Sequence, residues 1–211
     1  DTISVTGLGK KDFVSDLIVW SGSFSKKSMI LKDAYAALDS DREKIKSYLL
    51  SKGIQSNEVV FSAVNFNKDF DYIYNENGST KQQIFTGFNL TQTVTVQSKD
   101  VNKIEDISRQ SSELINSGVE FYSNAPEYYY TKLAELKIKM IAEATKDARV
   151  RAQSIAENAG AGLGNLKKSD MGVFQITGQN SSEDFSYGGS FNTMSKNKTA
   201  NITVKLVYQV D

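Results

Sequence analysis

The sequence predicts an α+β fold in which a largely antiparallel sheet carries three helices packed on one face. Segments typical of strands and of helices follow one another without the regular alternation of a parallel α/β sheet. Three segments have apolar residues at helical spacing, and two long segments of alternating apolar residues flank an Asn-Gly turn signal. Because a helix followed by Gly, an apolar residue and a strand occurs more than once, we also expect a weak internal duplication.

The first quarter of the chain predicts two strands and a helix. The strands cover 3–9 and 13–25, where apolar residues alternate with polar ones. The helix covers 28–54, and its apolar stripe consists of Leu31, Ala34, Tyr35, Leu38, Ile45, Tyr48 and Leu49. Gly53 suits the left-handed position just after a helix, and Ile54 suits the apolar contact that follows it.

A long hairpin is predicted over 59–97. Both halves are rich in β-branched and aromatic residues, and Asn77-Gly78 between them favours a type I′ turn. We expect the centre of so long a hairpin to be twisted, bulged or mobile.

The rest of the chain predicts two more helices and three more strands. The helices cover 100–117 and 134–159, and the strands cover 119–124, 171–177 and 200–210. The polar, Gly/Ser-rich segment 178–198 is expected to be a mobile loop. For 211 residues we expect either one domain over 1–211 or two intimately packed subdomains, about 1–97 and 98–211.

Composition excludes several kinds of chemistry. The chain has no Cys and no His, which removes disulfides, Cys/His zinc sites and the Ser-His-Asp and Cys-His arrangements. Lys+Arg and Asp+Glu both number 25, so no overall positive field favours nucleic acid, although a local patch stays open. No apolar run is long enough to span a membrane. Because the chain starts at Asp1, we expect an upstream segment, either a signal peptide or a lipid anchor.

The segment 143–164 combines a ladder of alanines with a glycine cluster. A phosphate site needs its glycines before a helix, where N–H groups point at the anion, but these glycines follow one. We therefore interpret Gly160 as the end of the helix and the glycines after it as a turn. Alanines at every fourth position leave a narrow face that permits close approach of another element.

This helix also carries a resemblance. Its pattern A-x-x-D-A-x-x-x-A-x-x-x-A, followed by Gly and Leu-Gly, resembles the signature of the SIMPL-domain family; the matching residues are Ala144, Asp147, Ala148, Ala152, Ala156, Gly160, Leu163 and Gly164. The opening strands, "MGVFQIT" and the closing strand are similar as well. The resemblance implies an α+β fold, export to the periplasm or cell envelope, a link with oxidative-stress defence in some members, and no established catalytic residue.

Other motifs are interpreted as coincidences. Ser23-x-x-Lys26 and Ser195-x-x-Lys198 match the spacing of serine–lysine acylases but lack the supporting triplets and a helix start. Asp39-x-Asp41 and Asp69-x-Asp71 lack the later ligands of a calcium-binding EF-hand loop. No pair of carboxylates stands out for glycoside cleavage. We therefore expect no catalytic residue, no cofactor site and no metal site.

The predicted function is that of a non-catalytic, exported bacterial envelope protein that binds or assembles with itself, with a role in stress tolerance. We expect a homo-oligomer formed through strand edges or the hairpin, because an antiparallel sheet with long terminal strands leaves edges open. The competing prediction is a monomer whose hairpin folds back on its own sheet. A ligand- or glycan-binding module that uses the aromatic hairpin 66–88 is the alternative function, and an enzyme that uses carboxylates or Ser/Lys is a third.

Overall fold

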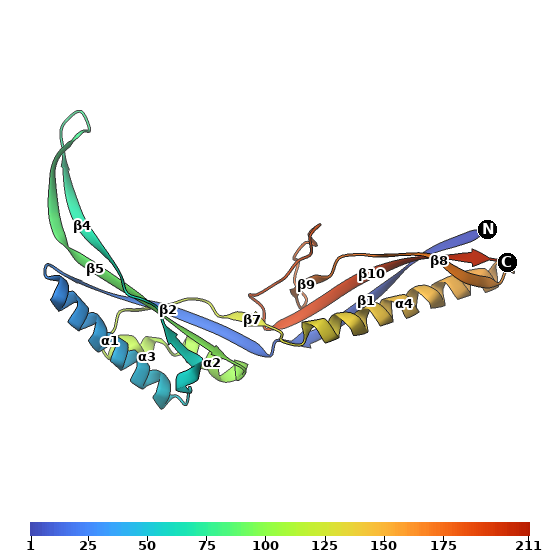
Figure 1. Cartoon of the computed structure of the whole chain (residues 1–211), viewed down its shortest axis with the longest axis horizontal. Coiled ribbons are helices and arrows are strands. Elements are labelled where there is room, and N and C mark those ends of the chain that lie inside the picture. The colour runs from blue at the N-terminus through green and yellow to red at the C-terminus, as the bar shows by residue number, and fades with distance from the viewer. The chain divides into compact units, whose positions relative to one another are not determined.

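The computed structural model describes all residues, 1–211, and confirms the α+β class (Figure 1). The chain divides into two compact units: residues 1–16 with 128–211 form unit 1, and residues 17–127 form unit 2. These boundaries differ from the one that we expected near residue 97. The reason lies in the first two strands, which pair with different partners instead of with each other.

Unit 1 contains a four-stranded sheet and one long helix. Its elements are β1 (Thr2–Val14), α4 (Leu133–Asn158), β8 (Leu163–Met171), β9 (Gln175–Gly178) and β10 (Asn197–Val210). β10 is central: it pairs with β1 along one edge and with β8 and β9 along the other, always antiparallel. The pairing with β1 is continuous from Thr2 opposite Gln209 to Val14 opposite Asn197.

The core of unit 1 lies between α4 and one face of this sheet. The alanine ladder that the sequence predicts as a contact face is fully buried there, since Ala144, Ala148 and Ala152 expose none of their surface. Most of the larger apolar residues come from the sheet, and they are Val5, Ile176, Ile202, Val204, Leu206 and Tyr208, while α4 adds Leu136 and Met140. The small residues of the ladder and the large ones on the strands thus fill the layer together.

Unit 2 contains an antiparallel sheet and three helices. Its strands are β2 (Leu17–Ser28), β3 (Val59–Phe61), β4 (Asn65–Tyr74), β5 (Thr80–Ser98) and β6 (Phe121–Ser123), and the short strand β7 (Glu127–Tyr129) lies at the sequence boundary of the units. The helices are α1 (Leu31–Ser51), α2 (Val101–Arg109) and α3 (Ser112–Asn116), and the 3-10 turn η1 (Ser56–Glu58) precedes β3. β5 pairs with β2 from Ser98 to Phe88.

The expected antiparallel strands are divided between two sheets, and a fourth, short helix, α3, accompanies the three expected ones. The predicted helix 100–117 is interrupted between Arg109 and Ser112, which separates α2 from α3. Inside unit 2, Trp20 and Phe24 of β2 are buried against the helices, and the Trp20 indole N–H donates to Ser123 Oγ at 2.9 Å.

The two units share one topology. Each begins with a strand, and its long helix is followed by three strands, the third of which becomes central: β10 lies between β1 and β8 in unit 1, and β5 lies between β2 and β3 in unit 2. Three helices also end alike. Gly53, Gly118 and Gly160 have φ values of 83°, 85° and 75°, and the residue after each glycine donates its N–H to a carbonyl five positions back. This common pattern is the structural counterpart of the repeat seen in the sequence.

The turn of the predicted hairpin has the expected place but not the expected type. The Gly78 N–H donates to the carbonyl of Asn75, and the Asn75 N–H donates to the carbonyl of Ser79. Gly78 has a positive φ of 80°, whereas Asn77 does not. A type I′ turn needs a positive φ at both central residues, so the connection is instead a turn followed by a left-handed glycine.

Candidate functional site

The residues that carry the family resemblance form a packing device in unit 1. Gly7 and Gly9 of β1 lie directly against the backbone of α4. A Cβ atom at Gly7 would collide with the carbonyl oxygen of Ala144 and the amide nitrogen of Ala148, and one at Gly9 would lie 2.6 Å from the carbonyl oxygen of Met140. Only glycine on the strand and alanine on the helix permit this approach.

Asp147, the one charged residue of the signature, serves the same contact. Its carboxylate accepts a hydrogen bond from the backbone amide of Leu8 at 2.9 Å and a second one from Arg151 Nε at 2.9 Å. The hydrogen bond from the Leu8 amide is the main cause that lowers the pKa of the Asp147 carboxyl below its usual value, and Arg151 lowers this pKa further. The signature therefore fixes α4 on β1, and it places no reactive group in a cavity.

In the structure, charged residues of the motifs that we interpreted as coincidences form ion pairs and hydrogen bonds unrelated to those motifs. Lys26 Nζ lies 3.2 Å from the buried carboxylate of Asp41, and Lys27 Nζ lies 3.1 Å from the exposed carboxylate of Asp69. Lys198 is almost completely buried, and its Nζ donates to the carbonyl of Asn192 at 2.5 Å. Burial lowers the pKa of Lys198 to about 8. Neither lysine of the Ser-x-x-Lys pairs has its serine among these partners.

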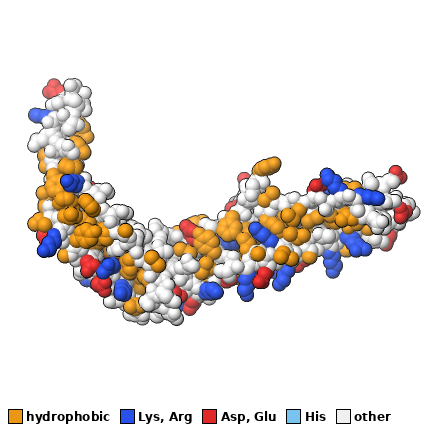
Figure 2. Space-filling model, in the orientation of Figure 1, with side chains coloured by type: hydrophobic (Ala, Val, Ile, Leu, Met, Phe, Trp, Pro, Cys, Tyr) orange, Lys and Arg blue, Asp and Glu red, His pale blue; other side chains and the backbone are white.

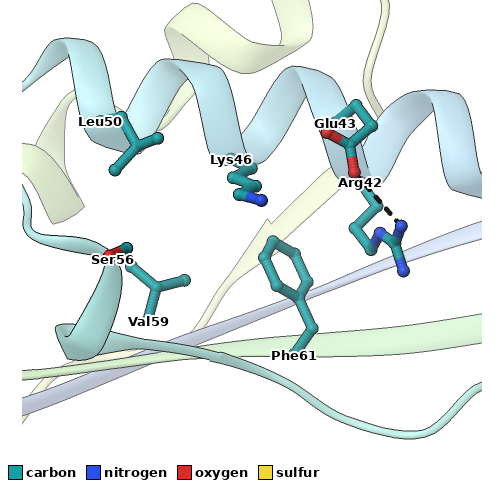
Figure 3. A pocket seen from close by; sticks show the side chains of 7 residues that line it. All are labelled: Arg42, Glu43, Lys46, Leu50, Ser56, Val59 and Phe61. Atoms are coloured by element: carbon teal, nitrogen blue, oxygen red, sulfur yellow. Dashed lines mark hydrogen bonds and ion pairs between the residues drawn. The ribbon is translucent and has the colours of Figure 1, made fainter.

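A cavity of about 360 Å³ lies between α1 and the strand β3 (Figure 3). Its α1 side carries Arg42, Glu43 and Lys46, and the ring of Phe61 forms part of the opposite side. Arg42 is already paired, with Asp39 at 2.8 Å and with Glu43 at 3.2 Å. This arrangement is typical of a solvated helix surface beside a short edge strand.

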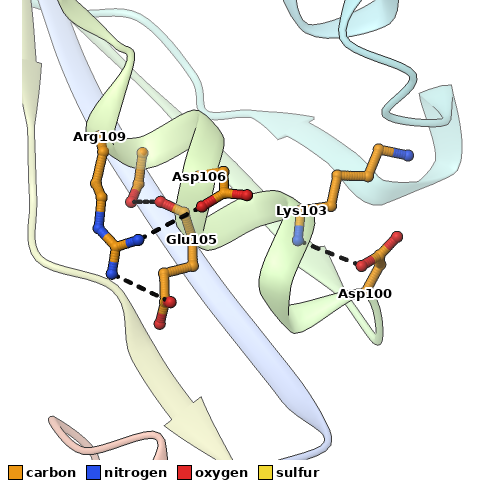
Figure 4. A network of polar contacts seen from close by, with 6 residues as sticks. Asp100, Lys103, Glu105, Asp106 and Arg109 are labelled. Atoms are coloured by element: carbon orange, nitrogen blue, oxygen red, sulfur yellow. Dashed lines mark hydrogen bonds and ion pairs between the residues drawn. The ribbon is translucent and has the colours of Figure 1, made fainter.

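The polar side chains on α2 pair with residues three or four positions away in the sequence (Figure 4). Asp100 caps the helix by accepting a hydrogen bond from the Lys103 amide at 3.3 Å. Arg109 pairs with Glu105 at 3.1 Å and with Asp106 at 3.4 Å, one helical turn away. Such pairs on an exposed helix support the helix itself.

The hairpin of β4 and β5, residues 65–88 and here called the hairpin arm, is the largest aromatic feature on the surface of unit 2. Residues opposite one another on paired strands share a face, so Phe66, Phe70, Tyr72 and Tyr74 of β4 lie on the same face as Phe85 and Phe88 of β5. Ring centroids are 5.7 Å apart for Phe70 and Phe85, and 5.1 Å apart for Phe85 and Phe88. Figure 2 shows hydrophobic side chains along the arm and at its base.

The aromatic face continues the buried core but has no cover of its own. Phe66 lies opposite Leu90, which is fully buried in the core, yet Phe66, Tyr72 and Tyr74 expose 50%, 48% and 61% of their surface. The pairing of β5 with β2 ends at Phe88, so the arm beyond it is a two-stranded ribbon. The opposite face is polar, with Asn67, Asp69 and Asp71 interrupted by Ile73 and Ile84. A two-stranded ribbon is marginally stable in water unless something packs on it.

The other sheet edges are short or carry a local obstacle to pairing. Asp147 accepts the outward amide of Leu8 on β1, and β8 has two register irregularities and exposed lysines at positions 167 and 168. β3 and β6 have only three residues each. The ten-residue β4 pairs with β5 alone, so its outer edge is the longest one in unit 2 that pairs with no strand.

Sequence reasoning identified the aromatic arm but missed a second aromatic group, on the segment 178–198. Tyr187 is completely exposed and Phe185 exposes 62% of its surface, both on a loop that the hydrogen bonds of Gln175 hold in place. The signal in the sequence was the pair of aromatic residues, Phe185 and Tyr187, just before Gly188-Gly189. It was overlooked because the rest of the segment is mostly polar.

None of the α-helices has the length and apolar composition that a membrane span requires.

Comparison with known proteins places the chain in a family. A search among curated proteins finds none similar to the chain. The family model described as "SIMPL: Protein of unknown function (DUF541)" matches residues 3–208. The match covers nearly the whole chain, so the protein belongs to the SIMPL family, as its resemblance in α4 and in the terminal strands predicted.

Proposed function

We propose that the protein is an exported bacterial envelope protein that acts by self-assembly rather than by catalysis, with a role in stress tolerance. The observation that carries the assembly proposal is the hairpin arm, whose aromatic face extends beyond the helices of its own unit. The proposals of export and stress tolerance rest on the family resemblance alone.

Burial of the aromatic face would supply the free energy of association. Fully burying one large apolar side chain is worth about 1.5–3 kcal/mol, and this face offers several that are half-exposed. A second copy of the chain presents the same face and the same free β4 edge, so two arms can pack face to face or extend each other's ribbon. The protected edges of unit 1 leave the arm as the favoured contact.

Light scattering after size exclusion tests the proposal with matched variants. The double variant Tyr72→Gln/Tyr74→Gln makes the aromatic face polar, and Ile73→Gln makes the same change on the opposite face. We expect an oligomer for the intact chain and for Ile73→Gln, and a smaller species for the double variant. A monomeric mass for the intact chain across micromolar concentrations would contradict assembly.

The compartment and the alternative function need their own measurements. Antibody detection in membrane, periplasmic and cytosolic fractions of the source cell tests export, and finding the protein only in the cytosol would refute it. If the arm instead serves as a glycan-binding surface, the Tyr72→Gln/Tyr74→Gln variant loses sugar binding while the mass of the intact chain stays monomeric.

A further inference from the structure

The loop between β9 and β10 borders a pocket in unit 1 that shares no residue with the hairpin arm. The pocket measures about 290 Å³. Two exposed aromatic residues of the loop, Phe185 and Tyr187, stand beside it, and its floor is the sheet face turned away from α4, with Leu8, Asn201 and Thr203. Its size is near the lower end of the range of small-molecule sites, about 300–1,000 Å³.

The floor is built by strand alternation. Gly7 and Gly9 of β1 face α4, so Leu8 between them faces the other way. Thr203 of β10 lies opposite Leu8 and shares its face, and Asn201 lies two residues away on that face. The Asn201 amide and the Thr203 hydroxyl make no side-chain hydrogen bond in the structure, so both are available to a ligand.

The aromatic wall is held in place by one glutamine. Gln175 Oε1 accepts from the amides of Ser186 and Ser190 at 3.1 and 2.8 Å and from Ser190 Oγ at 2.9 Å, while its Nε2 donates to the carbonyl of Ser186 at 2.7 Å. The backbone of β9 adds two bonds, from the Ile176 amide to Ser190 and from the Asn192 amide to Ile176. The loop therefore presents its aromatic residues from an ordered base, which reduces the entropy cost of binding.

We propose that this pocket binds a neutral saccharide unit. No charged residue lines it, so a charged ligand would lose its hydration without a compensating partner. A purely aliphatic ligand would bury the Asn201 amide and the Thr203 hydroxyl unpaired, at about 1–3 kcal/mol for each group. A pyranose ring satisfies both demands, because its C–H face stacks on an aromatic ring while its hydroxyls bond to an amide and a hydroxyl.

Saturation-transfer NMR with cellotetraose, maltotetraose and chitotetraose tests the site, because the signal is read on the sugar and can be measured for a monomer or an oligomer of the chain. We expect transfer to the ring C–H protons for at least one of the three sugars. Tyr187→Ala should weaken its Kd about tenfold or more, which corresponds to ~1.4 kcal/mol. Asn201→Leu should weaken it as well, since it removes the free amide.

The control is Tyr74→Ala, which removes another exposed tyrosine, 61% exposed, from the hairpin arm. It should leave the Kd unchanged. The proposal is overturned if none of the three sugars gives transfer at concentrations up to about 10 mM. It is also overturned if Tyr187→Ala binds as tightly as the intact chain, or if only Tyr74→Ala loses binding.

Discussion

The carboxylate of Asp147 accepts a hydrogen bond of 2.9 Å from the backbone amide of Leu8, which lies 139 positions away in the sequence. This bond joins the middle of α4 to the strand that begins the chain. It uses a backbone donor at the edge of the sheet, where another chain could otherwise pair.

The bond should make unfolding depend on pH in the acid range. Because the pKa of Asp147 is lowered in the folded protein, its stabilising contribution is complete above the ordinary carboxyl pKa and is lost as the pH falls through the folded value. Asp147→Ala should lower the urea midpoint at neutral pH, and this difference should shrink at acid pH. Asp170→Ala, which removes an exposed carboxylate, should change the midpoint little. A midpoint difference that stays constant with pH would show that the charge has no role.

Gly7→Ala should destabilise unit 1 by about 1–3 kcal/mol or more, because the new Cβ would collide with the backbone of α4 at Ala144 and Ala148. The control is Gly162→Ala, where a Cβ would have no atom within 4 Å. Chemical denaturation of both variants gives the comparison. Equal midpoints would mean that α4 moves away without cost.

Lys198 should make the protein more stable as the pH rises above about 8. The folded pKa of about 8 lies below the ordinary value of 10.5, so between these values the unfolded chain binds more protons and stability increases with pH, by up to about 3 kcal/mol. Lys198→Met should abolish this increase in thermal or urea unfolding measured from pH 7 to about 10. An identical pH profile for the variant would assign the increase to another group.

Two neighbouring lysines should differ greatly in their effect on stability. Lys26→Met leaves the Asp41 carboxylate, whose side chain is 3% exposed, without its partner, at a cost of about 3–5 kcal/mol. Lys27→Met breaks an exposed pair with Asp69 and should cost less than about 1 kcal/mol. Urea unfolding of the two variants measures both. Equal losses would show that water reaches Asp41.

The parts of the fold that could be predicted are those whose signals are local. Gly53 and Gly160 end helices because only glycine adopts the left-handed conformation freely, and the alanine ladder of α4 reports the close approach of another backbone. β8 was missed because it is an edge strand with mostly exposed polar residues, so it lacks the alternation that reveals a strand. The separation of β1 from β2 was missed because pairing partners far along the chain leave no local signal.

For the candidate sites, too, the features with a local signal in the sequence were predicted, and those that join distant residues were not. The aromatic hairpin arm was predicted because its composition is unusual along a continuous stretch. The pocket beside Tyr187 was not, since it joins residues of β1, β10 and the loop that are far apart in the sequence. The ordered base of the loop also could not be foreseen, because it depends on four hydrogen bonds of a single side chain, Gln175, which lies on β9 outside the loop.

The pairing of β1 with β10 also dictates an order of events during synthesis. Unit 2 is one continuous stretch, so it can fold as soon as residue 127 is available, whereas Thr2 must wait for Gln209. Until then β1 has no strand to pair with, and the alanine face of α4 lacks the part of its cover that β10 supplies. The nascent chain therefore carries a finished unit 2 between two unpaired ends, and unit 1 closes only when the last strand emerges.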